Sequence, residues 1–221
     1  DGSVLLGYTE NGDSEQGFVD KVLPSGQTVR FGKIKGITRV ILESRSGEVW
    51  AGTEAGLWRW SGEKFAPVQL PDMPLEFPVR GLVEDAQGRL FVGAHGHGLW
   101  MWDVRGEWQR LTADSDISSR EIWGITVDSS GTVWAATDSG LARWRQGIWS
   151  AYGTVNGELP RLARSVVCDN QNGLWLASQF GVARVNLDAL NKSTMGQDAI
   201  LDSDWFDRSD GLPSVSCSDE Q

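Results

Sequence analysis

The stretch IWGITVDSSGTVWAATDSGLARW (residues 122–144) decides the fold of this chain. An apolar run, Ile125–Val127, is followed by a turn in which Gly131 suits a positive φ. A second apolar run follows around Trp134, and a short polar segment then leads to Gly140 and a third run. Short apolar runs separated by tight turns predict an antiparallel β-sheet with no room for a helix.

The same pattern occurs at residues 36–60, 78–102 and 163–185, and in part at residues 1–12. The position after the turn is occupied in the five copies by Leu5, Trp50, Phe91, Trp134 and Trp175. The copies therefore recur roughly every 40 to 45 residues, a period typical of β-propeller blades. A further aromatic strand follows each copy, so each repeat supplies four strands. We predict an all-β chain with a single propeller domain over residues 1–221, built from five four-stranded antiparallel blades.

The two ends of the chain have complementary patterns. Residues 214–221 match the innermost strand of the other copies, and the partial first copy lacks that strand. We expect this last strand to pair with the three N-terminal strands, which would close the ring and remove its open sheet edges. The alternative is that the five repeats form part of a propeller with more blades.

The repeats resemble the two-component regulator propeller repeat. In residues 122–144 the pattern of that repeat is carried by Asp128, Gly131, Trp134, Gly140, Leu141 and Arg143. The segment SDGLPSVS (209–216) is similar to the link between blades in this family, whereas Leu5 departs from the usual Trp. The resemblance implies a periplasmic or extracellular sensor region of a membrane-spanning bacterial signalling protein. It also implies output domains elsewhere in that protein, or a second copy of the chain, as partners.

Composition narrows the function further. The chain has 221 residues, with 20 basic and 30 acidic side chains and a formal net charge of −10. This balance argues against nucleic acid as a partner. No apolar run approaches the length of a membrane span, and no signal peptide is visible. Cys168 and Cys217 fall at equivalent positions of neighbouring innermost strands, where we expect free thiols; a disulfide is the alternative.

One position of the repeat alignment is occupied by side chains that are suited to ligand binding. This position, at the start of the innermost strand, is Arg39, Arg80, Trp123 and Arg164 in the four complete copies. Arginine binds carboxylate or phosphate, and tryptophan offers a stacking face. The loops between second and third strands should share this face, and they hold Glu54, His95, His97, Asp138 and Gln179. We predict that these residues line a funnel mouth that binds a small anionic or sugar-derived ligand. The alternative is that the arginines pair with acidic neighbours and tie the blades together.

The two histidines, His95 and His97, are separated by one glycine. They could contact a ligand, lie in an exposed loop without a binding role, or act as active-site residues of a metal-assisted lyase or hydrolase. Because zinc requires three or four protein ligands, we assign no metal site, cofactor or catalytic residue. Tryptophans that recur in register are predicted to pack in the core, whereas Trp58 and Trp100 vary between copies and, like Trp123, are the better candidates for ligand contact.

The sequence therefore predicts an extracytoplasmic sensor or ligand-binding module without enzymatic activity. A lectin-like or protein-interaction scaffold with no signalling role is the second hypothesis, and the metal-assisted enzyme is the third.

Overall fold

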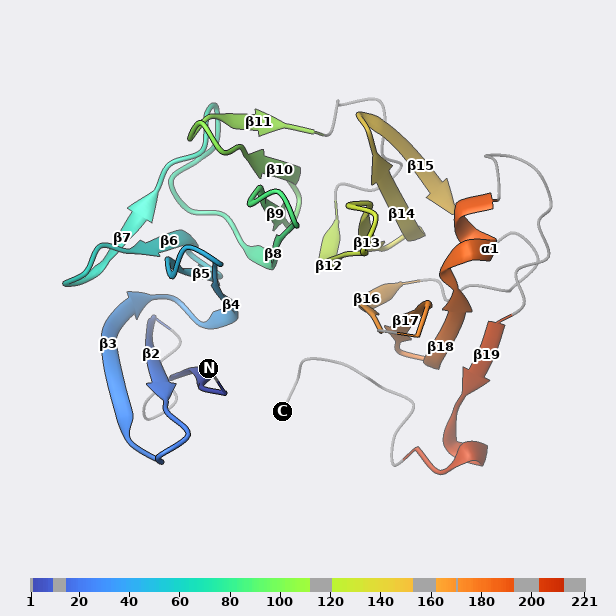
Figure 1. Cartoon of the computed structure of the whole chain (residues 1–221), viewed down its shortest axis with the longest axis horizontal. Coiled ribbons are helices and arrows are strands. Elements are labelled where there is room, and N and C mark those ends of the chain that lie inside the picture. The colour runs from blue at the N-terminus through green and yellow to red at the C-terminus, as the bar shows by residue number, and fades with distance from the viewer. Residues whose placement is uncertain are drawn as a thin grey trace. The chain divides into compact units, whose positions relative to one another are not determined.

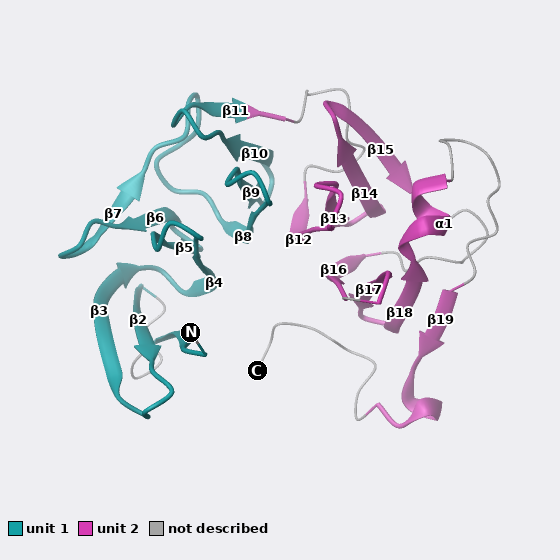
Figure 2. Ribbon diagram, viewed as in Figure 1, with its two compact units in different colours: residues 1–109 teal, residues 110–221 magenta. Residues whose placement is uncertain are grey.

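The computed structural model describes residues 2–9, 15–111, 121–152, 162–169, 171–192 and 203–212 (Figure 1). The chain divides into two compact units, residues 1–109 and 110–221 (Figure 2). Within the described residues, no helix is long and apolar enough to cross a membrane.

The first unit contains three antiparallel sheets whose strands follow one another in chain order. The first sheet has three strands, β1 (Val4–Thr9), β2 (Gln16–Val22) and β3 (Thr28–Lys35). The second has four, β4 (Thr38–Glu43), β5 (Val49–Thr53), β6 (Gly56–Trp60) and β7 (Phe65–Val68). The third also has four, β8 (Val79–Glu84), β9 (Leu90–Ala94), β10 (Gly98–Trp102) and β11 (Trp108–Arg110). The first strands lie side by side, since β4 contacts both β1 and β8.

The second unit contains two four-stranded antiparallel sheets. One is formed by β12 (Ile122–Val127), β13 (Val133–Thr137), β14 (Gly140–Arg145) and β15 (Ile148–Tyr152). The other is formed by β16 (Ala163–Cys168), β17 (Gly173–Ser178), β18 (Gly181–Asn186) and β19 (Ser203–Phe206). A short helix, α1 (Leu187–Lys192), precedes β19, and a 3-10 turn, η2 (Arg208–Asp210), follows it. Strands β12 and β16 are in contact.

The prediction of an all-β chain made of antiparallel repeats is confirmed. Four of the sheets have the predicted four strands in the predicted order, and the first has the three that the partial copy can supply. The predicted closing strand, residues 214–221, lies outside the described residues, as does Cys217. Ring closure and a single domain over residues 1–221 therefore stay predictions.

The turn between the first two strands is built by a local hydrogen-bond pattern. Asp128 Oδ1 accepts from the backbone N–H groups of Ser130 and Thr132 at 2.9 and 3.0 Å, while Oδ2 accepts from Trp134 Nε1 at 3.0 Å. Gly131 adopts φ 80° in this turn. An aspartate, a glycine and a tryptophan at fixed spacing thus form one structural unit, because the carboxylate accepts the N–H groups of the turn and of the indole while the glycine adopts the positive φ.

Small residues allow neighbouring sheets to approach closely. A methyl group added at Gly52 of β5 would lie 2.5 Å from Val79 Cγ1 of β8 and 2.7 Å from Val40 Cγ1 of β4. A methyl group at Gly7 of β1 would lie 2.6 Å from Thr38 Cγ2. Glycine is required at these two positions because another sheet occupies the space that a side chain would take.

Most of the recurring tryptophans contribute to the core, as predicted. Trp50 and Trp134 are 2% and 0% exposed. The prediction for the two variable tryptophans is wrong for Trp100, which is buried in the cluster that also contains Trp50. Trp58 is partly buried against the core, and its Nε1 donates to Thr53 Oγ1 at 3.2 Å. Packing against the faces of the sheets decides these outcomes, since the side chains of a strand project from the two faces of its sheet.

Candidate functional site

The first strand of each four-stranded sheet carries a β-bulge at the same place. In the β4–β5 pairing Thr38 faces Thr53 and Val40 faces Gly52, so the residue between them has no partner across the ladder. The same shift occurs between Val79 and Gly81, between Ile122 and Gly124, and between Ala163 and Ser165. The extra residues are Arg39, Arg80, Trp123 and Arg164. A bulge redirects its extra side chain, and this one lies beside the turn between second and third strands.

In the first unit the bulge residues form an ion-pair cluster with Glu54. Arg39 Nε lies 2.6 Å from Glu54 Oε1, and Arg80 Nη2 lies 3.1 Å from the same oxygen. Arg39 belongs to β4 and Arg80 to β8, while Glu54 lies in the turn between β5 and β6. One carboxylate therefore joins two sheets. This geometry matches the alternative that arginines tie neighbouring repeats together.

In the second unit the bulge residues form a different cluster. The Cζ atom of Arg164 lies 3.6 Å from the ring centroid of Trp123, so the guanidinium covers one face of the indole. Trp123 Nε1 in turn donates to Asp138 Oδ1 at 2.6 Å. Trp123 lies on β12 and Arg164 on β16, so this contact also joins two sheets. Asp138 binds the indole here, not an arginine as the alternative reading proposed.

Arg39 forms an ion pair with Glu54, whereas no carboxylate among the described residues pairs with Arg164. Its Nη1 atom is buried and finds no hydrogen-bond acceptor in that part of the chain. A buried, charged N–H group without an acceptor is energetically unfavourable.

Backbone hydrogen bonds stabilise the histidine loop. His95 N–H donates to Pro78 O at 2.9 Å, His97 N–H donates to Ala94 O at 3.0 Å, and Gly96 has φ 75°. The ring of His97 meets Phe77 edge-on, with centroids 6.3 Å apart. Both histidines are partly buried. The described residues contain no group of three or more His, Cys, Asp or Glu placed to hold a metal ion.

The corresponding turn of the last sheet exposes both of its central side chains. Gln179 is exposed, and Phe180 is 58% exposed. Ser178 Oγ supports the turn by accepting from the Phe180 N–H at 3.1 Å. Ala163 pairs with Ser178, so this turn lies at the same end of the sheet as Arg164. The sequence alignment singled out Gln179 and overlooked Phe180, although an aromatic residue in a polar turn is a recognisable signal.

Cys168 lies on β16 and is partly buried. Burial raises the pKa of its thiol to about 11, which keeps it protonated at neutral pH. Because Cys217 lies outside the described residues, free thiols and a disulfide both stay open.

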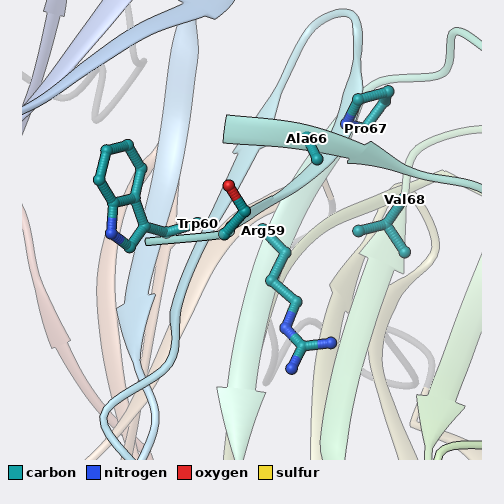
Figure 3. A pocket seen from close by; sticks show the side chains of 6 residues that line it. Arg59, Trp60, Ala66, Pro67 and Val68 are labelled. Carbon is teal, nitrogen blue, oxygen red and sulfur yellow. The ribbon is translucent and has the colours of Figure 1, made fainter. Parts of the chain in front are cut away.

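A surface pocket of about 390 Å³ lies over the outer strands β6 and β7 (Figure 3). It is lined by Arg59, Trp60, Ser61, Ala66, Pro67 and Val68. Figure 3 shows Arg59 and Trp60 pointing to opposite sides of β6. The Arg59 guanidinium stacks on Trp50 and Trp102, 5.2 and 5.1 Å from the ring centroids, and pairs with Glu48. The positive charge of Arg59 is thus paired with the carboxylate of Glu48. The pocket lies at the end of β6 opposite the end where the bulge of β4 is found.

Among the comparisons with known proteins, only the one with solved structures found similar proteins. No protein-family model and no curated protein sequence match the chain. Among solved structures, it resembles the extracellular domain of BT3049 from B. thetaiotaomicron, a protein described as a hybrid two component system. The TM-score is 0.69 at 16% identity, over 95% of this chain and 29% of that one. It also resembles the extracellular domain of BT4673 from the same organism, described as a one component system, with a TM-score of 0.57 at 15% identity over 91% and 35% of the two chains.

An enzyme shares the fold as well. Virginiamycin B lyase from Staphylococcus aureus matches with a TM-score of 0.63 at 12% identity, over 96% of this chain and 75% of the lyase. At such identities these likenesses establish a shared propeller-like, all-β fold. The chain spans about a third of the length of the two extracellular domains.

Proposed function

We propose that the chain is an extracytoplasmic sensor module of a bacterial signalling protein and a member of the two-component regulator propeller family. The observation that carries the proposal is the fold shared with the extracellular domain of BT3049 over 95% of this chain. The recurrence of the turn unit at Asp128 and Asp169 supports the family assignment, since both aspartates accept the indole N–H of the following tryptophan.

The ligand site in this proposal is the bulge end of the sheets. A bulge repeated at one register position presents three arginines and one tryptophan from an otherwise regular scaffold, and binding residues are often held in irregular segments of a rigid scaffold. In the first unit the candidates are Arg39, Arg80, Glu54, His95 and His97, and in the second unit they are Trp123, Arg164, Asp138 and Gln179. A small ligand bound there would change how the module packs on output domains or on a second copy, and so transmit the signal.

A ligand screen on the purified chain tests the proposal. Candidate cell-envelope fragments and small sugars, neutral and anionic, are added while thermal unfolding is followed. A ligand at about 100 times its Kd stabilises the folded state by about 2.7 kcal/mol. For a chain of this size, that corresponds to a rise in Tm of roughly 5 to 10 °C.

The site is then tested by Trp123→Leu, which should abolish the ligand-induced rise in Tm, with Arg145→Ala as a control. Arg145 is exposed on β14 and belongs to neither cluster. In the full-length protein, the same ligand should change output activity, and Trp123→Leu should abolish that response. Binding without any change in output would favour the lectin-like or scaffold hypothesis.

A further inference from the structure

We infer that Arg164, held on the face of Trp123, is the group that binds an oxyanion, and that the ligand of the second unit carries a carboxylate or a phosphate. This inference rests on the proposed function, because it names the chemical class of ligand for the same site.

The first step of the argument is the contrast between the two clusters. In the first unit Arg39 and Arg80 share the carboxylate of Glu54 at 2.6 and 3.1 Å, so part of their charge is compensated within the protein. In the second unit Arg164 contacts an uncharged ring, and no carboxylate among the described residues pairs with it. Within the described residues, no carboxylate therefore compensates the positive charge of Arg164, in a chain whose formal net charge is −10.

The second step is the geometry that holds Arg164. A guanidinium whose Cζ lies 3.6 Å from the ring centroid is in van der Waals contact with the indole face. In the stacked arrangement typical of arginine on aromatic rings, the N–H edge is left for acceptors in the guanidinium plane. The indole is itself oriented by its 2.6 Å hydrogen bond to Asp138. Arginine fixed in this way loses little conformational entropy on binding, and its planar edge matches the two oxygens of a carboxylate or phosphate.

The third step is the hydrogen-bond deficit. Arg164 Nη1 is buried without an acceptor in the described residues. A bound oxyanion would supply that acceptor and would convert an unfavourable buried donor into a charge-assisted hydrogen bond. The exposed side chains of Gln179 and Phe180 lie at the same end of the β16–β17 pair, where they offer an amide and an aromatic face to the rest of a ligand.

The test follows the indole N–H of Trp123 by NMR in the ¹⁵N-labelled chain, with Trp123→Phe used to assign the signal. Inorganic phosphate and acetate are titrated at constant ionic strength against chloride. Glucose 6-phosphate, glucuronate and neutral glucose follow, so that phosphate and carboxylate sources are distinguished. We expect a saturable shift with at least one oxyanion and none with chloride. Arg164→Ala should weaken the affinity by more than about tenfold, and Arg164→Lys by less. Arg145→Ala should leave it within about twofold.

Two different failures can be told apart. If a neutral ligand from the screen shifts the Trp123 signal and Arg164→Ala binds it equally well, the oxyanion assignment is overturned while the sensor proposal stands. If no probe or screened ligand produces a saturable shift and Arg164→Ala only lowers Tm, both proposals are wrong. Arg164 then has a purely structural role, which is to join two neighbouring sheets. Should Arg164→Ala not fold, Arg164→Lys and Arg164→Gln carry the same comparison, with unchanged signals elsewhere in the spectrum as the folding control.

Discussion

Trp175 donates its indole N–H to Oδ2 of Asp169 at 2.8 Å, across the turn between β16 and β17. The other oxygen of Asp169 accepts from the backbone of Gln171 and Gly173 at 2.8 and 2.7 Å. The indole bond, the two backbone bonds and a contact with Arg184 hold the pKa of Asp169 at about 2, against an ordinary value of 3.8. The carboxylate and the tryptophan thus stabilise the turn together.

The lowered pKa of Asp169 predicts a specific acid sensitivity. Because the folded-state pKa lies below the unfolded value, the carboxylate stabilises the fold fully above about pH 4, and this contribution is lost as the pH falls toward 2. Asp169→Asn should therefore lower Tm at pH 7 and flatten the dependence of Tm on pH between 4 and 2. Calorimetry over that range measures both effects. Asp188→Asn, which removes an exposed carboxylate in α1, is the control and should retain the wild-type slope. An Asp169→Asn slope equal to that of wild type would contradict the prediction.

The shared carboxylate of Glu54 predicts a stability role for the first cluster. Glu54→Ala should destabilise the chain by roughly 1 to 2 kcal/mol, because it removes the carboxylate that links β4 to β8, and the partial exposure of these groups limits the loss. Urea unfolding of Glu54→Ala, Arg80→Ala and the double variant measures the coupling energy. A coupling near zero would show that the ion pair does not stabilise the fold.

The close approach at Gly52 predicts a steric penalty. Gly52→Ala places a methyl group 2.5 Å from Val79 Cγ1 and should cost about 1 to 3 kcal/mol through overpacking. Gly124→Ala is the matched control, since the nearest atoms to an added methyl there are 3.5 Å away. Chemical denaturation compares the two variants, and combining Gly52→Ala with Val79→Ala should recover part of the loss. Equal stability of the two single variants would refute the steric account.

The raised pKa of Cys168 predicts slow thiol chemistry. A thiol with a pKa of about 11 forms very little thiolate at pH 8, and only the thiolate reacts with iodoacetamide. In a Cys217→Ser background, alkylation of Cys168 should be at least about tenfold slower in the folded chain than in urea. Mass spectrometry of timed samples gives the rates. Equal rates in both conditions would mean that the thiol is exposed and ordinary.

The repeat architecture could be predicted from sequence because it depends on local interactions. Gly131 and Asn172 adopt φ 80° and 61° at equivalent turns, and only residues that tolerate a positive φ fit there. The bond between Asp128 and Trp134 lies within one turn, so its spacing is visible in the chain. The column of Arg39, Arg80, Trp123 and Arg164 could also be found, since it recurs at one register position.

Only the tertiary structure decided what that column does. A bulge is a shift between two paired strands, and it becomes visible only when the pairing is known. The partner of each bulge residue comes from a neighbouring sheet, as when Arg80 of β8 reaches Glu54 and Arg164 of β16 covers Trp123 of β12. Among the described residues, the same column therefore contains an ion pair in one unit and a guanidinium without a carboxylate partner in the other, because charge compensation depends on what packs beside a residue and not on its place in the repeat.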